Sequence, residues 1–216
     1  MELSDIFRIL RQRGWLILVL MALTAAAAFG FSRIQTPVYQ SNLKLLVLPS
    51  RTDFGQAQAA KTLLSSYEQW LRSTYRAQAV INDLQLDMTA GDLLGDVRVA
   101  SDANAFVIDL TVENTDPNLA NDIARSWGNQ LIQWQNANND KLQKEDRITI
   151  EFLDDPQAGL DRPDTKINTA AGAVFGLLLG VALLFLLEWL ASGVMRRSED
   201  VERYLNIAVI GTIPQE

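Results

Sequence analysis

Residues 167–187 read INTAAGAVFGLLLGVALLFLL, a stretch without a single charged side chain. A helix needs roughly 20 mostly apolar residues to cross about 30 Å of hydrocarbon. This stretch meets that requirement, and its length and lack of charge argue against the core helix of a soluble domain. We therefore predict a membrane-spanning helix here and assign residues 169–191 to it.

A second apolar stretch, WLILVLMALTAAAAFGF, covers residues 15–31 near the N-terminus. It is slightly short for a span, but Ser32 and the snorkelling side chains of Arg13 and Arg33 can extend it. We assign residues 15–33 to a first membrane-spanning helix.

A cleaved signal peptide is the alternative interpretation of this first stretch. Arginines precede it and the alanine run Ala25–Ala28 offers a cleavage site. Against this alternative, the leader, residues 1–14, contains Glu2 and Asp5 and carries apolar residues at helical spacing. That pattern favours a short amphipathic, cytoplasmic helix leading into a retained span.

Each predicted span has one face of small residues at a spacing of four. Small side chains let helix backbones approach closely in lipid, so these residues are predicted to pack spans together, within or between subunits. The six positions are Ala22, Ala26, Gly30, Gly172, Gly176 and Gly180.

Basic residues flank the outer ends of both spans. They are Arg8, Arg11 and Arg13 before the first span and Arg196, Arg197 and Arg203 after the second. By the positive-inside rule, both termini are predicted to be cytoplasmic, including the tail at residues 192–216. Residues 34–153 then form an extracytoplasmic domain.

Composition excludes several classes of function. The net charge is −7 and its excess negative charge lies between the spans, which argues against a nucleic-acid partner. The chain has no Cys and no His, so disulfides, the usual zinc sites and Cys or His nucleophiles and bases are excluded.

The segment between the spans shows the alternation of strands and the periodicity of helices. Leu43, Leu45 and Val47 indicate a strand, and two helices follow, at 56–71 and after a predicted cap at Thr74. Two strands around 97–99 and 106–112 come next. We predict an α+β domain with a mainly antiparallel sheet and helices on one face.

The clearest helix start follows the third strand. Asp116 can cap a helix and Pro117 suits its first position. A last strand is expected at 148–152, and residues 154–168, with Pro156 and Pro163, are predicted to form an extended connector to the second span.

No catalytic, cofactor or metal site is predicted. The acidic residues between 154 and 164 lack the spacing of a calcium loop and are interpreted as a solvated loop. Trp70, Trp127 and Trp134 could stack on sugar rings, but at helical spacing they more often serve as core or subunit-contact residues.

Several segments, taken in order, resemble the Wzz-type chain-length determinant family, the polysaccharide co-polymerases. The segments are LSDIFRILRQRGWLILVL at 3–20, VYQSNLKLLV at 38–47, VIDLTVENTDPNLANDIARSWGNQLI at 107–132, the Pro-containing connector, and RRSEDVERYLNIAVIGTIPQE at 196–216. Together they are spread over nearly the whole chain. The segment between residues 56 and 143 leaves little room for the long helical extension of larger family members.

The resemblance implies a kinase-less form of the family. The Gly-Thr-Ile-Pro region, which in membrane-bound tyrosine autokinases leads into a kinase domain, stands here next to Glu216, without a Walker motif. Such proteins are membrane adaptors of a separate cytoplasmic tyrosine kinase. The tail residues implied to contact it are Arg196, Arg197, Tyr204, Gly211 and Pro214.

The leading hypothesis is a non-enzymatic, homo-oligomeric protein of the bacterial inner membrane. It would regulate chain length or export in extracellular, capsular or O-antigen polysaccharide biosynthesis, together with the polymerase or export machinery. One alternative is a two-span sensor or scaffold whose extracytoplasmic domain binds a ligand. Another, an enzyme acting on envelope sugars, has no carboxylate pair that the sequence singles out.

Overall fold

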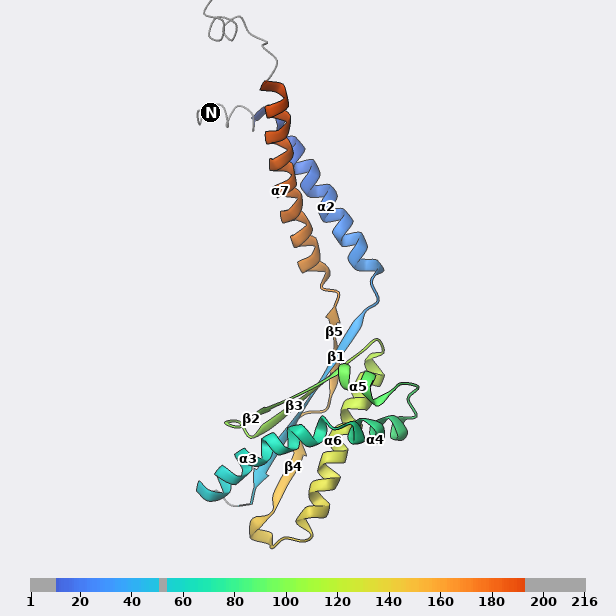
Figure 1. Ribbon diagram of the computed structural model, residues 1–216, viewed down its shortest axis with the longest axis vertical. Helices are drawn as coiled ribbons and strands as arrows, with labels where there is room; N and C mark the ends of the chain where they lie inside the picture. The colour runs from blue at the N-terminus through green and yellow to red at the C-terminus, as the bar shows by residue number, and fades with distance from the viewer. Residues whose placement is uncertain (1–10, 51–53, 193–216) are drawn as a thin grey trace, which may run out of the picture. The chain divides into compact units, whose positions relative to one another are not determined.

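The computed structural model describes residues 11–50 and 54–192, which fall into two units (Figure 1). One unit takes in the chain up to Gln35 and from Asp164 onward, and the other is Thr36–Pro163. Two helices in the first unit are long and apolar enough to cross a membrane, and the second unit combines helices with an antiparallel sheet. The predicted fold class is therefore confirmed.

The first unit contains α2 (Trp15–Ile34) and α7 (Thr165–Ser192), which pack against each other. The 20 residues of α2 give it a length of about 30 Å, which matches the hydrocarbon core of a bilayer. Asp164 caps α7, because its Oδ1 accepts from the backbone N–H groups of Lys166 at 3.0 Å and Ile167 at 3.1 Å. This cap starts the helix ahead of the predicted boundary at residue 169.

The second unit is built around β1 (Val38–Pro49), the longest strand of a five-stranded sheet. One edge of β1 pairs with β3 (Val107–Asn114), whose outer edge pairs with β2 (Val97–Asp102). The other edge of β1 pairs with β4 (Ile148–Phe152) and, nearer its start, with β5 (Gln157–Arg162). All four pairings are antiparallel, as predicted for most of the sheet.

One face of this sheet is buried and the other is polar. Leu43 and Leu45 of β1 stand beside Leu110 and Ile108 of β3, and these side chains are at most 1% exposed. The opposite face carries polar groups, such as the Lys44 ammonium, 4.0 Å from the Asp109 carboxylate. The alternation predicted for these strands is thus confirmed.

Helices cover the buried face, and they contribute to one core with the strands. They are α3 (Phe54–Leu71), α4 (Thr74–Leu84), the short α5 (Ala90–Gly95) and α6 (Pro117–Asn139). The predicted start of α6 is confirmed: Pro117 is its first residue, and Asp116 Oδ1 accepts from the Asn118 N–H at 2.8 Å. The prediction that Thr74 caps α4 is wrong, because Ser73 holds the cap position and Thr74 is already helical.

The predicted connector, residues 154–168, does not lie wholly outside the sheet. Its middle part forms β5, which extends one edge of β1, and its last residues belong to α7. Pro156 is buried immediately before β5, and Pro163 is half-buried immediately after it. Both prolines therefore bound a strand, where a missing backbone N–H is tolerated.

A buried network of polar side chains ties α3, α6 and β4 together. The Tyr67 hydroxyl donates to Gln135 Oε1 at 3.0 Å, and Gln135 Nε2 donates to Asn139 Oδ1 at 3.0 Å. Asn139 completes the network on β4, since its Nδ2 donates to the Ile148 carbonyl at 2.7 Å and its Oδ1 accepts from the Ile148 N–H at 3.1 Å. Burial raises the pKa of Tyr67 to about 12, so the phenol keeps its proton and its donor role at neutral pH.

Replacing Asn139 with leucine is expected to destabilise the second unit by about 3 kcal/mol. The change leaves Gln135 Nε2 and both polar backbone groups of Ile148 buried without the partner that Asn139 supplies, while Gln135 Oε1 keeps the Tyr67 hydroxyl. Chemical denaturation of the full chain in mild detergent, followed by circular dichroism, measures the loss. Asn136→Leu is the matched control, because Asn136 is exposed on the same helix and its change should cost less than about 0.5 kcal/mol. Equal midpoints for the two variants would contradict the structural role given to Asn139.

Candidate functional site: the helix pair and the α4–α6 cleft

The glycine face of α7 lies directly against α2. A Cβ atom added to Gly172 would stand 2.6 Å from Ala28 Cβ, and one added to Gly180 would stand 2.8 Å from Ile17 Cα. Real Cβ atoms do not approach other heavy atoms so closely, so only glycine permits this separation of the two backbones. The glycine face that the sequence predicts on α7 is therefore the face along which α7 contacts α2.

Gly176 is the tightest point of the pair. A Cβ atom there would overlap the Thr24 hydroxyl and stand 2.7 Å from Met21 Cα and 2.8 Å from the Leu20 carbonyl oxygen. Two of these three neighbours are backbone atoms, which cannot move aside as a flexible side chain can. Thr24 itself is fixed by donating to the Leu20 carbonyl at 2.9 Å.

The small face of α2 points elsewhere. Ala22 and Ala26 are exposed in the single chain, and a Cβ atom added to Gly30 would meet nothing within 4 Å. The residues that α2 turns toward the α7 glycines are Ile17, Thr24 and Ala28 instead. A packing role for Ala22, Ala26 and Gly30 stays a prediction, and it would have to involve another molecule.

Polar contacts join the helix pair near both ends. Near one end, Ser32 is 1% exposed, lies 3.3 Å from the Thr165 hydroxyl and accepts from Asn168 Nδ2 at 3.1 Å. Near the other, Arg13 Nη1 lies 4.0 Å from Glu188 Oε2. Sequence reasoning could not identify this contact with Glu188, because pairing across two helices leaves no local signal.

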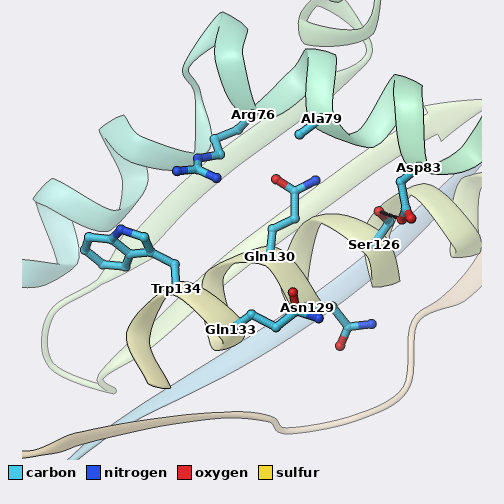
Figure 2. A pocket seen from close by; sticks show the side chains of 8 residues that line it. All are labelled: Arg76, Ala79, Asp83, Ser126, Asn129, Gln130, Gln133 and Trp134. Carbon is cyan, nitrogen blue, oxygen red and sulfur yellow. Dashed lines mark hydrogen bonds between the residues drawn. The ribbon is translucent and has the colours of Figure 1, made fainter. Parts of the chain in front are cut away.

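A cleft of about 650 Å³ runs between α4 and α6 in the second unit (Figure 2). From α4 it is lined by Arg76, Ala79 and Asp83, which follow one another along a single helix face. From α6 it is lined by Ser126, Asn129, Gln130, Gln133 and Trp134.

Three polar side chains of the cleft, Arg76, Asp83 and Ser126, already have partners. Ser126 Oγ donates to Asp83 Oδ2 at 2.6 Å, which joins the two helices at one end of the cleft. The Arg76 guanidinium lies 3.9 Å from the centre of the Trp70 ring. Gln130 differs, because its Oε1 is buried and has no hydrogen-bond partner among the residues that the structure describes.

The three tryptophans singled out in the sequence occupy different places. Trp127 is wholly buried in the core, where its Nε1 donates to the Leu71 carbonyl at 3.0 Å. Trp134 is partly exposed and lines the cleft, held by Trp70 at 5.1 Å between ring centres and by Tyr67 at 6.0 Å. Of the three, only Trp134 lines the cleft.

Two further points concern the predicted tail contacts and the acidic residues. The tail residues Arg196, Arg197, Tyr204, Gly211 and Pro214 lie outside the described residues. Within residues 11–50 and 54–192, no group of three or more carboxylates is placed to hold a metal ion.

Comparison with known proteins finds one matching family model and relatives that align with this chain over nearly their whole length. Residues 1–84 match the model of the Wzz family, described as chain length determinant protein. A probable capsular polysaccharide biosynthesis protein of Bacillus subtilis, YwqC, is 27% identical over 98% of this chain and 87% of its own length. The capsular polysaccharide biosynthesis protein CpsC of Streptococcus pneumoniae is 24% identical over 99% and 94%, and CpsC of Streptococcus agalactiae is 26% identical over 97% and 93%.

The matched region begins in the leader and ends at Leu84, the last residue of α4, so it covers the first membrane helix, the central strand of the sheet and one wall of the cleft. The relatives extend the similarity through α6 and α7. The resemblance seen in the sequence is thus confirmed: residues 1–84 match the Wzz family model, and relatives named for capsular polysaccharide biosynthesis are similar over nearly the whole chain.

Proposed function

We propose that this chain is a non-enzymatic membrane protein that controls the length or export of a capsular or other extracellular polysaccharide. The observation that carries the proposal is the match to the Wzz family model, joined to similarity over nearly the full length of relatives named for capsular polysaccharide biosynthesis. The two apolar helices support a place in the membrane, since each is long enough to span it.

In this proposal the protein is an adaptor in the inner membrane of a bacterium. Both termini lie on the cytoplasmic side, where Arg196, Arg197, Tyr204, Gly211 and Pro214 contact a tyrosine kinase. Subunits associate into a homo-oligomer that works with the polymerase or export machinery. The exposed Ala22 and Ala26 support this part, because their face of α2 is not used by α7 and suits a neighbouring helix.

Deletion of the gene tests the proposal. The expected result is less surface polysaccharide or a changed length distribution on a gel, with both restored by the full chain expressed from a plasmid. A chain ending at Ser192 tests the adaptor role apart from membrane insertion, because it keeps both apolar helices and lacks the tail. It should insert in the membrane at normal levels but should not restore tyrosine phosphorylation of the kinase. Polysaccharide of unchanged amount and length after deletion would rule out the proposal.

A further inference from the structure

The α4–α6 cleft has the size and polarity of a ligand site. Its volume of about 650 Å³ lies within the range of about 300–1,000 Å³ that small-molecule sites occupy. The space exists because Ala79, in the middle of the α4 face, has a side chain too small to fill it. Figure 2 shows the Gln130 carboxamide reaching from α6 toward α4, on the side where Arg76 and Ala79 lie.

The groups that line the cleft favour an uncharged ligand rich in hydroxyl groups. Arg76 and Asp83 carry opposite charges, so the cleft offers no net attraction for an ion of either sign. The amide of Gln130 reaches toward α4 (Figure 2), and the amides of Asn129 and Gln133 also line the cleft; each can donate and accept hydrogen bonds. An apolar ligand would leave these amides without partners, whereas hydroxyl groups satisfy both their donors and their acceptors.

Two further features match a sugar ring in particular. Gln130 Oε1 is buried without a partner among the described residues, so the oxygen gains a hydrogen bond and loses none when the carboxamide turns to accept from a ligand hydroxyl in the cleft. Trp134 lines the same cleft, and its contacts with Trp70 and Tyr67 hold the indole in place. An indole fixed in this way is an amphipathic surface against which the C–H face of a sugar ring can pack.

From this combination we propose that the α4–α6 cleft binds a short segment of neutral saccharide. The proposal rests on the proposed function, because it takes the bound segment to be part of the polysaccharide that the protein controls. It goes further by placing the contact on named residues of α4 and α6. Gln130 accepts from a ligand hydroxyl, Trp134 packs against a ring, and Ala79 leaves the room.

Filling the cleft tests the proposal. The probes are short oligosaccharides, made by mild acid hydrolysis of the surface polysaccharide of the cells that produce this protein. Binding to the full chain in mild detergent is measured by calorimetry and by saturation-transfer NMR. Ala79→Gln should weaken binding about tenfold or more, because the longer side chain occupies the cleft and hydrogen-bonds its amides. Gln130→Met, which keeps the length and removes the buried acceptor, should also weaken it.

The matched control is Ala137→Gln, the same substitution at an exposed alanine of α6 that does not line the cleft. It should bind the oligosaccharides as the unchanged protein does. Thermal unfolding of each variant shows whether a loss of binding reflects a loss of fold. Because Gln130 Oε1 lacks a partner, Gln130→Met should melt no lower than the unchanged protein, which makes it the cleaner of the two variants.

Three outcomes would overturn the inference: an unchanged protein that binds none of the oligosaccharides, an Ala79→Gln variant that binds them normally, and an Ala79→Gln variant that alters only the oligomer mass. The last result would identify the cleft as a contact between copies. None of these outcomes decides the proposed function, because gene deletion measures polysaccharide length without reference to the cleft. A deletion without effect would remove the proposed function whatever the cleft binds.

Discussion

Trp127→Ala is expected to remove a large part of the stability of the second unit. The side chain is wholly buried where α6 meets the sheet, and removing a buried tryptophan costs about 3–5 kcal/mol. The Leu71 carbonyl, which accepts from the indole at 3.0 Å at the end of α3, also loses its partner. Domains are stable by only about 5–15 kcal/mol, so this one change removes much of the total.

Limited trypsin digestion of the full chain in mild detergent, together with circular dichroism, measures the effect. Trp127→Phe should be digested at a rate between those of the unchanged protein and Trp127→Ala, because it keeps most of the ring volume but loses the hydrogen bond. Trp15→Ala is the control for removal of an indole, since Trp15 is 60% exposed on α2. Digestion of Trp127→Ala at the same rate as the Trp15→Ala control would show that the core does not depend on this residue.

Gly176→Leu is expected to separate α2 from α7. Its Cβ atom would collide with the Thr24 hydroxyl and with backbone atoms of Leu20 and Met21, which cannot give way without moving the whole helix. Overpacking of this kind costs about 1–3 kcal/mol or more, which corresponds to about a fivefold or larger fall in the equilibrium constant for the closed pair.

Disulfide trapping measures that population without background, because the chain contains no Cys. Ser32→Cys with Thr165→Cys places two thiols where hydroxyl oxygens lie 3.3 Å apart, and alkylation with mass spectrometry counts the thiols left free. Adding Gly176→Leu to this double variant should slow the cross-link strongly. Gly30→Leu is the control, since a Cβ atom there meets nothing within 4 Å. Equal cross-linking in the two would refute the close packing at Gly176.

Most elements with a repeated apolar pattern could be predicted from the sequence. The strand with Leu43, Leu45 and Val47 buries one face of a sheet, so alternation identifies it. The start of α6 could be predicted because Asp116 suits the cap position and Pro117 suits the first position of a helix. The two apolar helices are apparent from composition alone, because only a membrane requires stretches of that length.

The elements that escaped prediction lack such a pattern. β5 is an edge strand whose residues are nearly all exposed, so nothing in its sequence alternates. α5 has only six residues, too few to show a period, although Thr89 and Asp92 form a capping box that could have indicated it.

The cleft was also beyond sequence reasoning, for a different reason. It depends on two helix faces that come together only in the folded unit. A partial signal exists, since Arg76, Ala79 and Asp83 recur along one face of α4, while Ser126, Gln130 and Trp134 recur along one face of α6. Trp134 was considered as a sugar-stacking residue, but its spacing alone could not separate it from Trp127 in the core.

The position of β1 at the centre of the sheet has a consequence for biogenesis. It is the first strand to be synthesised, yet β3, β4 and β5, which occupy both of its edges, are made much later. Until then its hydrogen-bonding edges are open to pairing with other nascent chains, and such long-range pairing is slow. The sheet cannot close before β5, the last strand ahead of α7, has been made. Completion of the sheet is thereby timed to the synthesis of the second apolar helix.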